Sequence, residues 1–346
     1  MIKLLILQNL VPHYRKPVYN ELSKYYDVTV LHSGKKSVEE NDYFKEIVVP
    51  SRSIGPFILQ SGIMNGVRKG QYDVVIAMAD LHWICNFIVH FFAKHVRFLY
   101  WGHRYSKYPF INILRDYFIR ISDGVILYSE GEVKKMLSRG IPASKIFIAH
   151  NTMHVPNHSD GSGVPKDSFI FSGRAQKRKK IDVLIRAFKE VLGRIPDNTK
   201  INIIGAGDEN DNLKNLTEHL GLSDRVIFRG EIADHAKLKH YFQKAYAYVS
   251  PGPVGLGVLH SFAYGVPVVT HYCEKHGPEF DNLVNGENAL LYNTYEELKE
   301  ILVSLCKDKE LSKRLGQNSY KKYSEERNIH KMVASFRNAI ENIRIY

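Results

Sequence analysis

The chain has 346 residues, of which 44% are hydrophobic and 24% charged, a composition typical of a folded globular protein with room for two domains. Its formal net charge of +12 favours an anionic partner, but nucleic acid is the least supported one because no nucleic-acid-binding signature occurs. No apolar run reaches the roughly 20 residues that span a bilayer. The three cysteines are odd in number and far apart, which favours a reducing, cytoplasmic setting.

The first half of the chain alternates short apolar segments with helical ones, the pattern of an α/β protein with a doubly wound parallel sheet. The expected strands are Ile2–Leu7, Val28–Leu31, Ile47–Val49, Val74–Met78, Val96–Trp101, Val125–Tyr128 and Ile146–Ala149.

Aromatic residues and cations interleave between His82 and Arg120, where Asp116 is the only acidic residue. Rings at headgroup depth and cations facing anionic lipid would suit a membrane surface. The alternative is a core helix followed by a strand with basic edges, and the sequence leaves both open.

A polar linker rich in Gly, Ser and Pro, Pro156–Lys166, predicts the domain boundary. We expect a first domain over 1–156 and a second over 167–328, with the last helix, about 329–346, folding back on the first. Strands of the second domain are expected at Phe169, Ile201, Val226, Ala247, Val266 and Ala289.

Two loops of the second domain look suited to an anion. Ser250–Thr270 reads as strand, glycine-bearing turn, helix and strand, so the N–H groups of Gly255, Leu256 and Gly257 would lie at a helix N-terminus. Phe169–Asp182 is a buried strand followed by a cationic loop. Either loop alone could be a plain turn or a solvated basic loop. Both at one edge of one sheet predict a diphosphate site.

These segments resemble the nucleotide-sugar half of the GT-B glycosyltransferases, specifically the retaining family 4, also called glycosyl transferases group 1. The resemblance runs from Phe169 to about Tyr292 and covers most of the second half. Its landmarks are Gly173-Arg174 with Lys179, the turn Ile203–Asp208, the strand Leu222–Gly230, Gly255-Leu256 through Val269, and Asn285–Leu291. It implies a GT-B fold, two Rossmann-like domains facing across a cleft, with the first binding the acceptor.

By this resemblance, Arg174 and Lys179 would bind the donor diphosphate and stabilise its charge during catalysis. An arginine offers a planar fork to phosphate, and a lysine offers a mobile point charge. No Asp-x-Asp metal motif occurs, so we expect no metal and no cofactor besides the donor, which would be UDP- or GDP-linked.

The chain departs from the family at two positions. Gly252 and His260 stand where the family has paired glutamates. His260 could still hydrogen-bond a ribose hydroxyl, whereas Gly252 could offer the donor sugar only its backbone N–H. Glu279 follows Pro278 as in the family and could supply a carboxylate, although a glutamate at a helix start needs no such role.

Three residues of the first half are further candidates. His103 follows the strand Val96–Trp101 and matches a region where family members often carry a histidine that contacts the donor sugar; the alternative is an interface histidine. His13 and Arg15, in the loop after the first strand, could hold an acceptor or a phosphate, but this loop also suits an ordinary helix start.

The resemblance implies transfer of a sugar from a nucleotide-diphosphate sugar to a cell-surface polysaccharide or lipid-linked glycan, in the cytoplasm at the inner face of the cell membrane. Because of Gly252 and His260, a catalytically silent nucleotide-sugar-binding or scaffold subunit is the first alternative. A basic nucleic-acid- or lipid-binding protein with this fold is the second.

Overall fold

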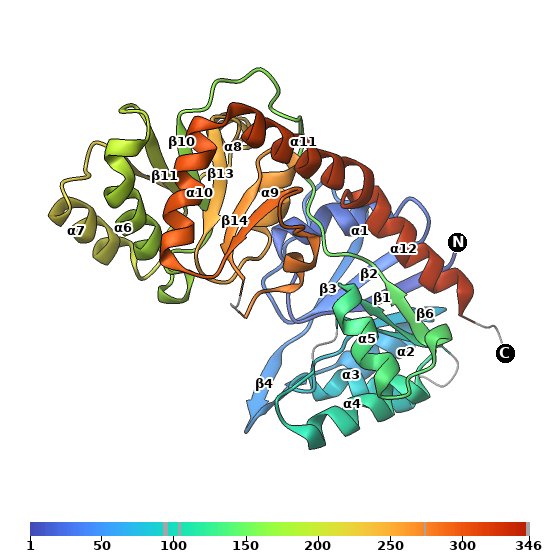
Figure 1. Ribbon diagram of the computed structural model, residues 1–346. Coiled ribbons are helices and arrows are strands. Elements are labelled where there is room, and N and C mark those ends of the chain that lie inside the picture. Colours follow the sequence, from blue (N-terminus) through green and yellow to red (C-terminus); the bar gives the residue numbers. More distant parts are fainter. Residues whose placement is uncertain (93–95, 103–104, 273–274, 344–346) are drawn as a thin grey trace. The chain divides into compact units, whose positions relative to one another are not determined.

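A computed structural model describes residues 1–92, 96–102, 105–272 and 275–343. The chain divides into two compact units, which Figure 1 shows: Met1–His154 together with Asn328–Tyr346, and Val155–Arg327. The last helix therefore belongs to the first unit, and the segment interpreted as a linker belongs to the second. Ser159 in that segment donates its N–H to the Ala263 carbonyl at 3.1 Å, so it is packed rather than free.

The first unit is built on a seven-stranded parallel sheet in the order β3-β2-β1-β6-β7-β8-β9. Its strands are β1 (Lys3–Leu7), β2 (Asp27–His32), β3 (Lys45–Val48), β6 (Val74–Met78), β7 (Arg97–Trp101), β8 (Gly124–Leu127) and β9 (Ile146–Ile148). Every strand predicted from the first half is confirmed. Because β1 pairs with both β2 and β6, the winding direction of the sheet reverses between β1 and β6.

Helices cover both faces of this sheet, so its central strands are mostly apolar. Leu4 and Ile6 of β1 join one core cluster with α1 and α12, while Leu5 and Leu7 join another with α2, α3, α4 and α5. The helices are η1 (His13–Arg15), α1 (Lys16–Leu22), α2 (Ile63–Gly70), α3 (Ile84–Phe92), α4 (Pro109–Ile121), α5 (Glu130–Ser138), η2 (Ala143–Lys145) and α12 (Ile329–Asn342).

An antiparallel hairpin of β4 (Ser51–Ile54) and β5 (Phe57–Gln60) was not predicted. All four residues of β4 are exposed. Because β4 has no buried face, it has no apolar alternation by which the sequence could show the hairpin.

The second unit contains a six-stranded parallel sheet in the order β12-β11-β10-β13-β14-β15. The strands are β10 (Ser168–Ser172), β11 (Lys200–Ile204), β12 (Val226–Gly230), β13 (Ala245–Ser250), β14 (Val268–His271) and β15 (Ala289–Tyr292), as predicted. The winding reverses between β10 and β13, which pair directly. The helices are η3 (Lys177–Lys179), α6 (Ile181–Val191), η4 (Leu192–Arg194), α7 (Asn210–His219), α8 (His235–Gln243), α9 (Gly257–Ala263), η5 (Pro278–Asn282), α10 (Tyr295–Lys307) and α11 (Lys309–Glu326).

Candidate donor-binding site

The two loops that the sequence predicts to bind an anion follow the carboxyl ends of β10 and β13, at the reversal point of the second sheet. Open α/β sheets bind ligands at this position, because neighbouring loops diverge there and leave a crevice. Arg174 follows β10 by two residues, and its exposed guanidinium makes no hydrogen bond or ion pair with any residue that the structure describes. Its charge is therefore available to a ligand.

Lys179 lies on η3 and is only 9% exposed. Its ammonium donates a hydrogen bond to the Pro253 carbonyl, in the loop after β13. Burial and the nearby charge of Arg178 together lower the pKa of Lys179 to about 8, against the opposing effect of the Glu279 carboxylate. Because the Lys179 ammonium has three N–H donors and uses one of them on Pro253, two remain for an anion.

Gly252 is the contact point between these two loops. Its N–H donates to the Lys179 carbonyl at 3.0 Å, and a Cβ at this position would lie 2.1 Å from the Arg178 carbonyl oxygen and 2.7 Å from the Lys179 Cα. The Gly252 N–H therefore holds the lysine turn, and its predicted contact with a donor sugar stays a prediction. The absence of a glutamate here has a packing reason: the lysine turn occupies the space of any side chain.

The start of α9 presents its backbone to the same edge of the sheet. The N–H groups of Gly255, Leu256 and Gly257 donate no hydrogen bond to any described residue. At Gly257, an added Cβ would lie 2.5 Å from the Tyr248 hydroxyl, which itself lies 3.4 Å from the Ser172 carbonyl at the end of β10. This close approach brings the free amides next to the loop that carries Arg174.

His260 lies one turn into α9, half-buried, with its ring centroid 6.1 Å from that of Phe242 and 6.4 Å from that of His235. Both neighbours belong to α8, so the imidazole lies between two helices of the second unit. Its predicted contact with a ribose hydroxyl stays a prediction.

Glu279, on η5, is 5% exposed and lies close enough to Lys179 to raise the pKa of its ammonium. Sequence reasoning missed a neighbour, His276. The Val254 N–H donates to His276 Nδ1 at 3.1 Å, and Nε2 lies 2.7 Å from the His271 carbonyl, so the neutral tautomer with its proton on Nε2 holds the glycine loop. With 16 histidines in the chain, nothing in the sequence singled out this one.

The remaining candidate residues, Arg15, His13 and His103, belong to the first unit. Arg15 is 5% exposed and donates to Asn151 Oδ1 at 2.7 Å and to the Tyr128 hydroxyl at 3.3 Å. Its guanidinium lies 4.9 Å from the centre of the Trp101 ring. Through these contacts Arg15 joins η1 to the strand ends, and its predicted ligand role stays a prediction. His13 is exposed, and His103 lies outside the described residues.

A cavity of about 400 Å³ opens at the reversal point of the first sheet. Asp80 and His82 form a hydrogen-bonded pair at its edge, with 2.8 Å between Asp80 Oδ1 and His82 Nδ1. Trp101 is nearly fully buried, and its indole N–H finds no acceptor among the described residues. The lining residues are Gln8, Met78, Ala79, Asp80, His82, Trp101, Gly102, Arg115 and Tyr128. Carboxylate and indole N–H groups are suited to hydroxyl groups of a ligand.

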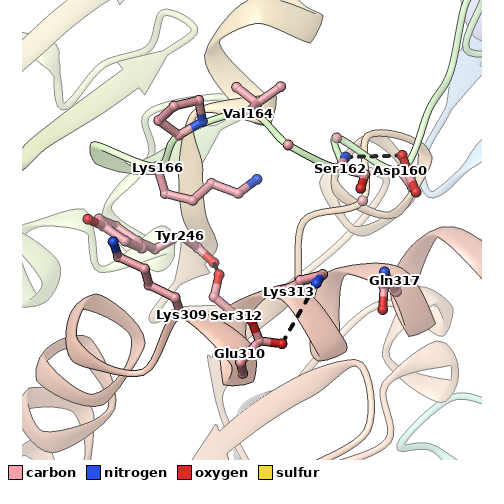
Figure 2. A pocket seen from close by; sticks show the side chains of 14 residues that line it. Asp160, Ser162, Val164, Lys166, Tyr246, Lys309, Glu310, Ser312, Lys313 and Gln317 are labelled. Atoms are coloured by element: carbon pink, nitrogen blue, oxygen red, sulfur yellow. Dashed lines mark hydrogen bonds and ion pairs between the residues drawn. The ribbon is translucent and has the colours of Figure 1, made fainter.

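Figure 2 shows a different cavity of the second unit, about 370 Å³, between the 160–166 segment and the start of α11. Lys166 precedes β10, and its Nζ donates to the Gln243 carbonyl at 2.7 Å; burial lowers its pKa to about 8. This cavity lies at the amino ends of the strands, so it is separate from the loops that carry Arg174 and Gly252.

The described residues contain no group of three or more His, Cys, Asp or Glu side chains placed to hold a metal ion. Across the same residues, helices are too short or too polar to cross a bilayer. Cys85 and Cys306 are buried free thiols.

The sequence of the second unit matches the family model "Glycosyl transferases group 1" over residues 158–322. Residues 158–322 are therefore similar to a glycosyl transferases group 1 domain, and the chain is a glycosyltransferase. An uncharacterised glycosyltransferase of Haemophilus influenzae is 23% identical over 290 residues, 81% of this chain and 80% of that protein.

Two further relatives have specific names. The poly(glycerol-phosphate) alpha-glucosyltransferase of Bacillus subtilis is 24% identical over 63% of this chain, and the alpha-monoglucosyldiacylglycerol synthase of Acholeplasma laidlawii is 28% identical over 48% of it. These alignments span 33% and 43% of the two relatives.

Solved structures confirm the GT-B fold of this glycosyltransferase. An Anabaena protein, Alr3699/HepE, solved in complex with UDP, has a TM-score of 0.76 at 18% identity and covers 99% of this chain and 100% of its own. A glycosyltransferase from Rickettsia africae has a TM-score of 0.79 at 15% identity, covering 100% of this chain and 99% of its own.

Proposed function

We propose that this glycosyltransferase moves a sugar from a UDP- or GDP-linked donor to a cell-surface polysaccharide or lipid-linked glycan, with retention of configuration and without a metal, as a divergent member of family 4. The observation that carries the proposal is that Arg174, Lys179 and three backbone N–H groups, which donate to no described residue, lie on the loops that leave β10 and β13 at the reversal point of the second sheet. Cations and fixed amides at one sheet edge are suited to a diphosphate.

The chemistry follows from the charge that develops on the leaving group. As the bond between the anomeric carbon and the diphosphate oxygen breaks, negative charge grows on the diphosphate and positive charge on the sugar ring. Groups fixed in place before the reaction stabilise this change without reorganising. Arg174 and Lys179 would bind the departing phosphates, and the amides of Gly255–Gly257 would add fixed partial charges. His260 is assigned the ribose, and His103 the donor sugar.

The acceptor is assigned to the cavity of the first unit. Asp80 supplies a carboxylate that could accept the proton of an attacking hydroxyl. A relative named for a diacylglycerol product and another named for a glycerol-phosphate polymer support acceptors that are lipid-linked or part of the cell surface. Such acceptors place the reaction at the inner face of the membrane.

Calorimetric titration with UDP, GDP and a panel of their sugars, in the presence of EDTA, tests the proposal. We expect one nucleotide to bind and its matching sugar donor to be hydrolysed or transferred once lipid-linked acceptors are added. Binding with neither hydrolysis nor transfer would favour the silent-subunit alternative. If the folded protein bound no nucleotide, and instead bound polyanions in a steeply salt-dependent way, the donor assignment would be lost.

Donor binding should also depend on pH through Lys179. Its pKa in the free protein is about 8, and a diphosphate favours the ammonium form, so affinity should be constant below pH 8 and fall up to about tenfold per pH unit above it. Nucleotide calorimetry between pH 6.5 and 9.5 measures this slope. Lys179→Met should remove the slope, whereas Lys166→Met should keep it, because Lys166 has a similar pKa but lies at the opposite sheet edge. A slope retained in Lys179→Met contradicts the assignment.

A further inference from the structure

Helix α4 carries apolar side chains on the face that meets solvent. Phe110, Ile113 and Tyr117 are 76%, 63% and 49% exposed, whereas Asn112 and Asp116 are buried on the opposite face. The exposed residues recur at intervals of three and four, so they form one stripe along the helix. A surface helix normally shows the reverse pattern, and an exposed apolar stripe of this kind marks a binding surface.

Helix α3 widens the stripe into a patch. The Phe91 ring lies 5.6 Å from that of Phe118 on α4, and Phe87 packs against the same ring at 4.5 Å, so the two helices are neighbours, as Figure 1 shows. We define the α3–α4 surface as the exposed apolar residues of these helices: Ile88, Phe91, Phe92, Phe110, Ile113, Leu114, Tyr117 and Ile121.

The exposed charges within the segment that forms this surface are of one sign. Asp116, the only acidic residue between His82 and Ser122, is buried, accepts a hydrogen bond from the Tyr105 hydroxyl at 3.0 Å and pairs with Arg139 at 2.5 Å. Lys107 precedes α4 and Arg120 lies in its last turn, and both are exposed. The Arg120 guanidinium also donates to the Gly140 and Arg139 carbonyls at 2.7 and 2.6 Å, which fixes its charge beside α4. Among the described residues of 82–122, this surface therefore combines aromatic rings with cations and no exposed carboxylate.

We propose that the α3–α4 surface docks on an anionic lipid bilayer. Aromatic rings settle at the level of the headgroups, apolar side chains reach the acyl boundary, and cations pair with lipid phosphates. A second copy of the chain is a poorer occupant, since a twofold dimer through this face would bring Lys107 and Arg120 of both copies together without carboxylates to pair them. The proposal extends the membrane setting of the proposed function, but its test needs neither donor nor acceptor.

Co-sedimentation with phosphatidylcholine vesicles, with and without roughly 30 mol% phosphatidylglycerol, measures the docking. The wild-type protein should sediment with the anionic vesicles and stay in solution with the neutral ones. Replacing the stripe, Phe110→Ser with Ile113→Ser and Tyr117→Ser, should reduce partitioning about tenfold or more. The matched control, Tyr43→Ser with Val284→Ser, removes exposed apolar side chains elsewhere and should bind like the wild type.

Two further measurements check the fold and the donor site of the stripe variant. Thermal unfolding and nucleotide calorimetry of the stripe variant should match the wild type, so loss of vesicle binding can be separated from misfolding and from failure of the donor site. Lys107→Glu should weaken binding to anionic vesicles. Equal partitioning of wild type and stripe variant would overturn the proposal. So would a wild-type dimer that ignores vesicles and becomes monomeric in the stripe variant by light scattering.

Discussion

Replacing Arg174 or Lys179 by alanine is expected to raise the barrier to transfer by about 2 to 4 kcal/mol, or roughly 30- to 1000-fold in kcat/KM, the scale of losing one charge-stabilising group. Arg174 has no partner among the described residues, so its removal should leave the fold intact. Lys179 holds the Pro253 carbonyl, so its loss should also weaken nucleotide binding. Steady-state transfer and UDP or GDP calorimetry measure the two effects.

Lys177→Ala is the matched control for this pair. Lys177 lies on the same turn, η3, carries the same charge as Lys179 and is exposed. If catalysis needed only positive charge near the diphosphate, and no specific contact, Arg174→Ala, Lys179→Ala and Lys177→Ala should all lose similar activity. Wild-type turnover in both Arg174→Ala and Lys179→Ala would show that the diphosphate binds elsewhere.

Placing a glutamate at position 252 is expected to damage the enzyme. Any Cβ there would meet the Arg178 carbonyl at 2.1 Å, so Gly252→Ala and Gly252→Glu should push the lysine turn away. We expect a loss of about 1 to 3 kcal/mol of folding stability, the usual cost of forcing extra atoms into a packed site, and a fall in nucleotide affinity of more than tenfold. Denaturant unfolding and calorimetry follow the two losses.

Gly193→Ala controls for glycine replacement in general, because nothing lies within 4 Å of its added Cβ. It should unfold and bind nucleotide like the wild type. A Gly252→Glu variant that is as stable as the wild type and more active would contradict our account, and would show that the family's glutamate can be accommodated.

The donor-side loops were predicted well because each carries a local signal. Gly255–Gly257 follow a short apolar strand, and Arg174 follows another, so both loops could be assigned to strand ends. The acceptor side carries no such local signal. A charged residue in a loop resembles a ligand-binding residue, and only the packing showed that Arg15 is enclosed by Trp101, Tyr128 and Asn151.

The sequence by itself determined the strands, the parallel sheets and the cationic glycine loops, because apolar periodicity and turn residues act over a few neighbouring positions. Only the tertiary structure decided how distant segments meet. It brought the turn of Lys179 against Gly252, which explains why no side chain stands there. It also turned the apolar stripe of α4 outward and the acidic residue Asp116 inward. Helical periodicity defines a stripe but not the direction it faces, because that depends on which surfaces the rest of the fold buries.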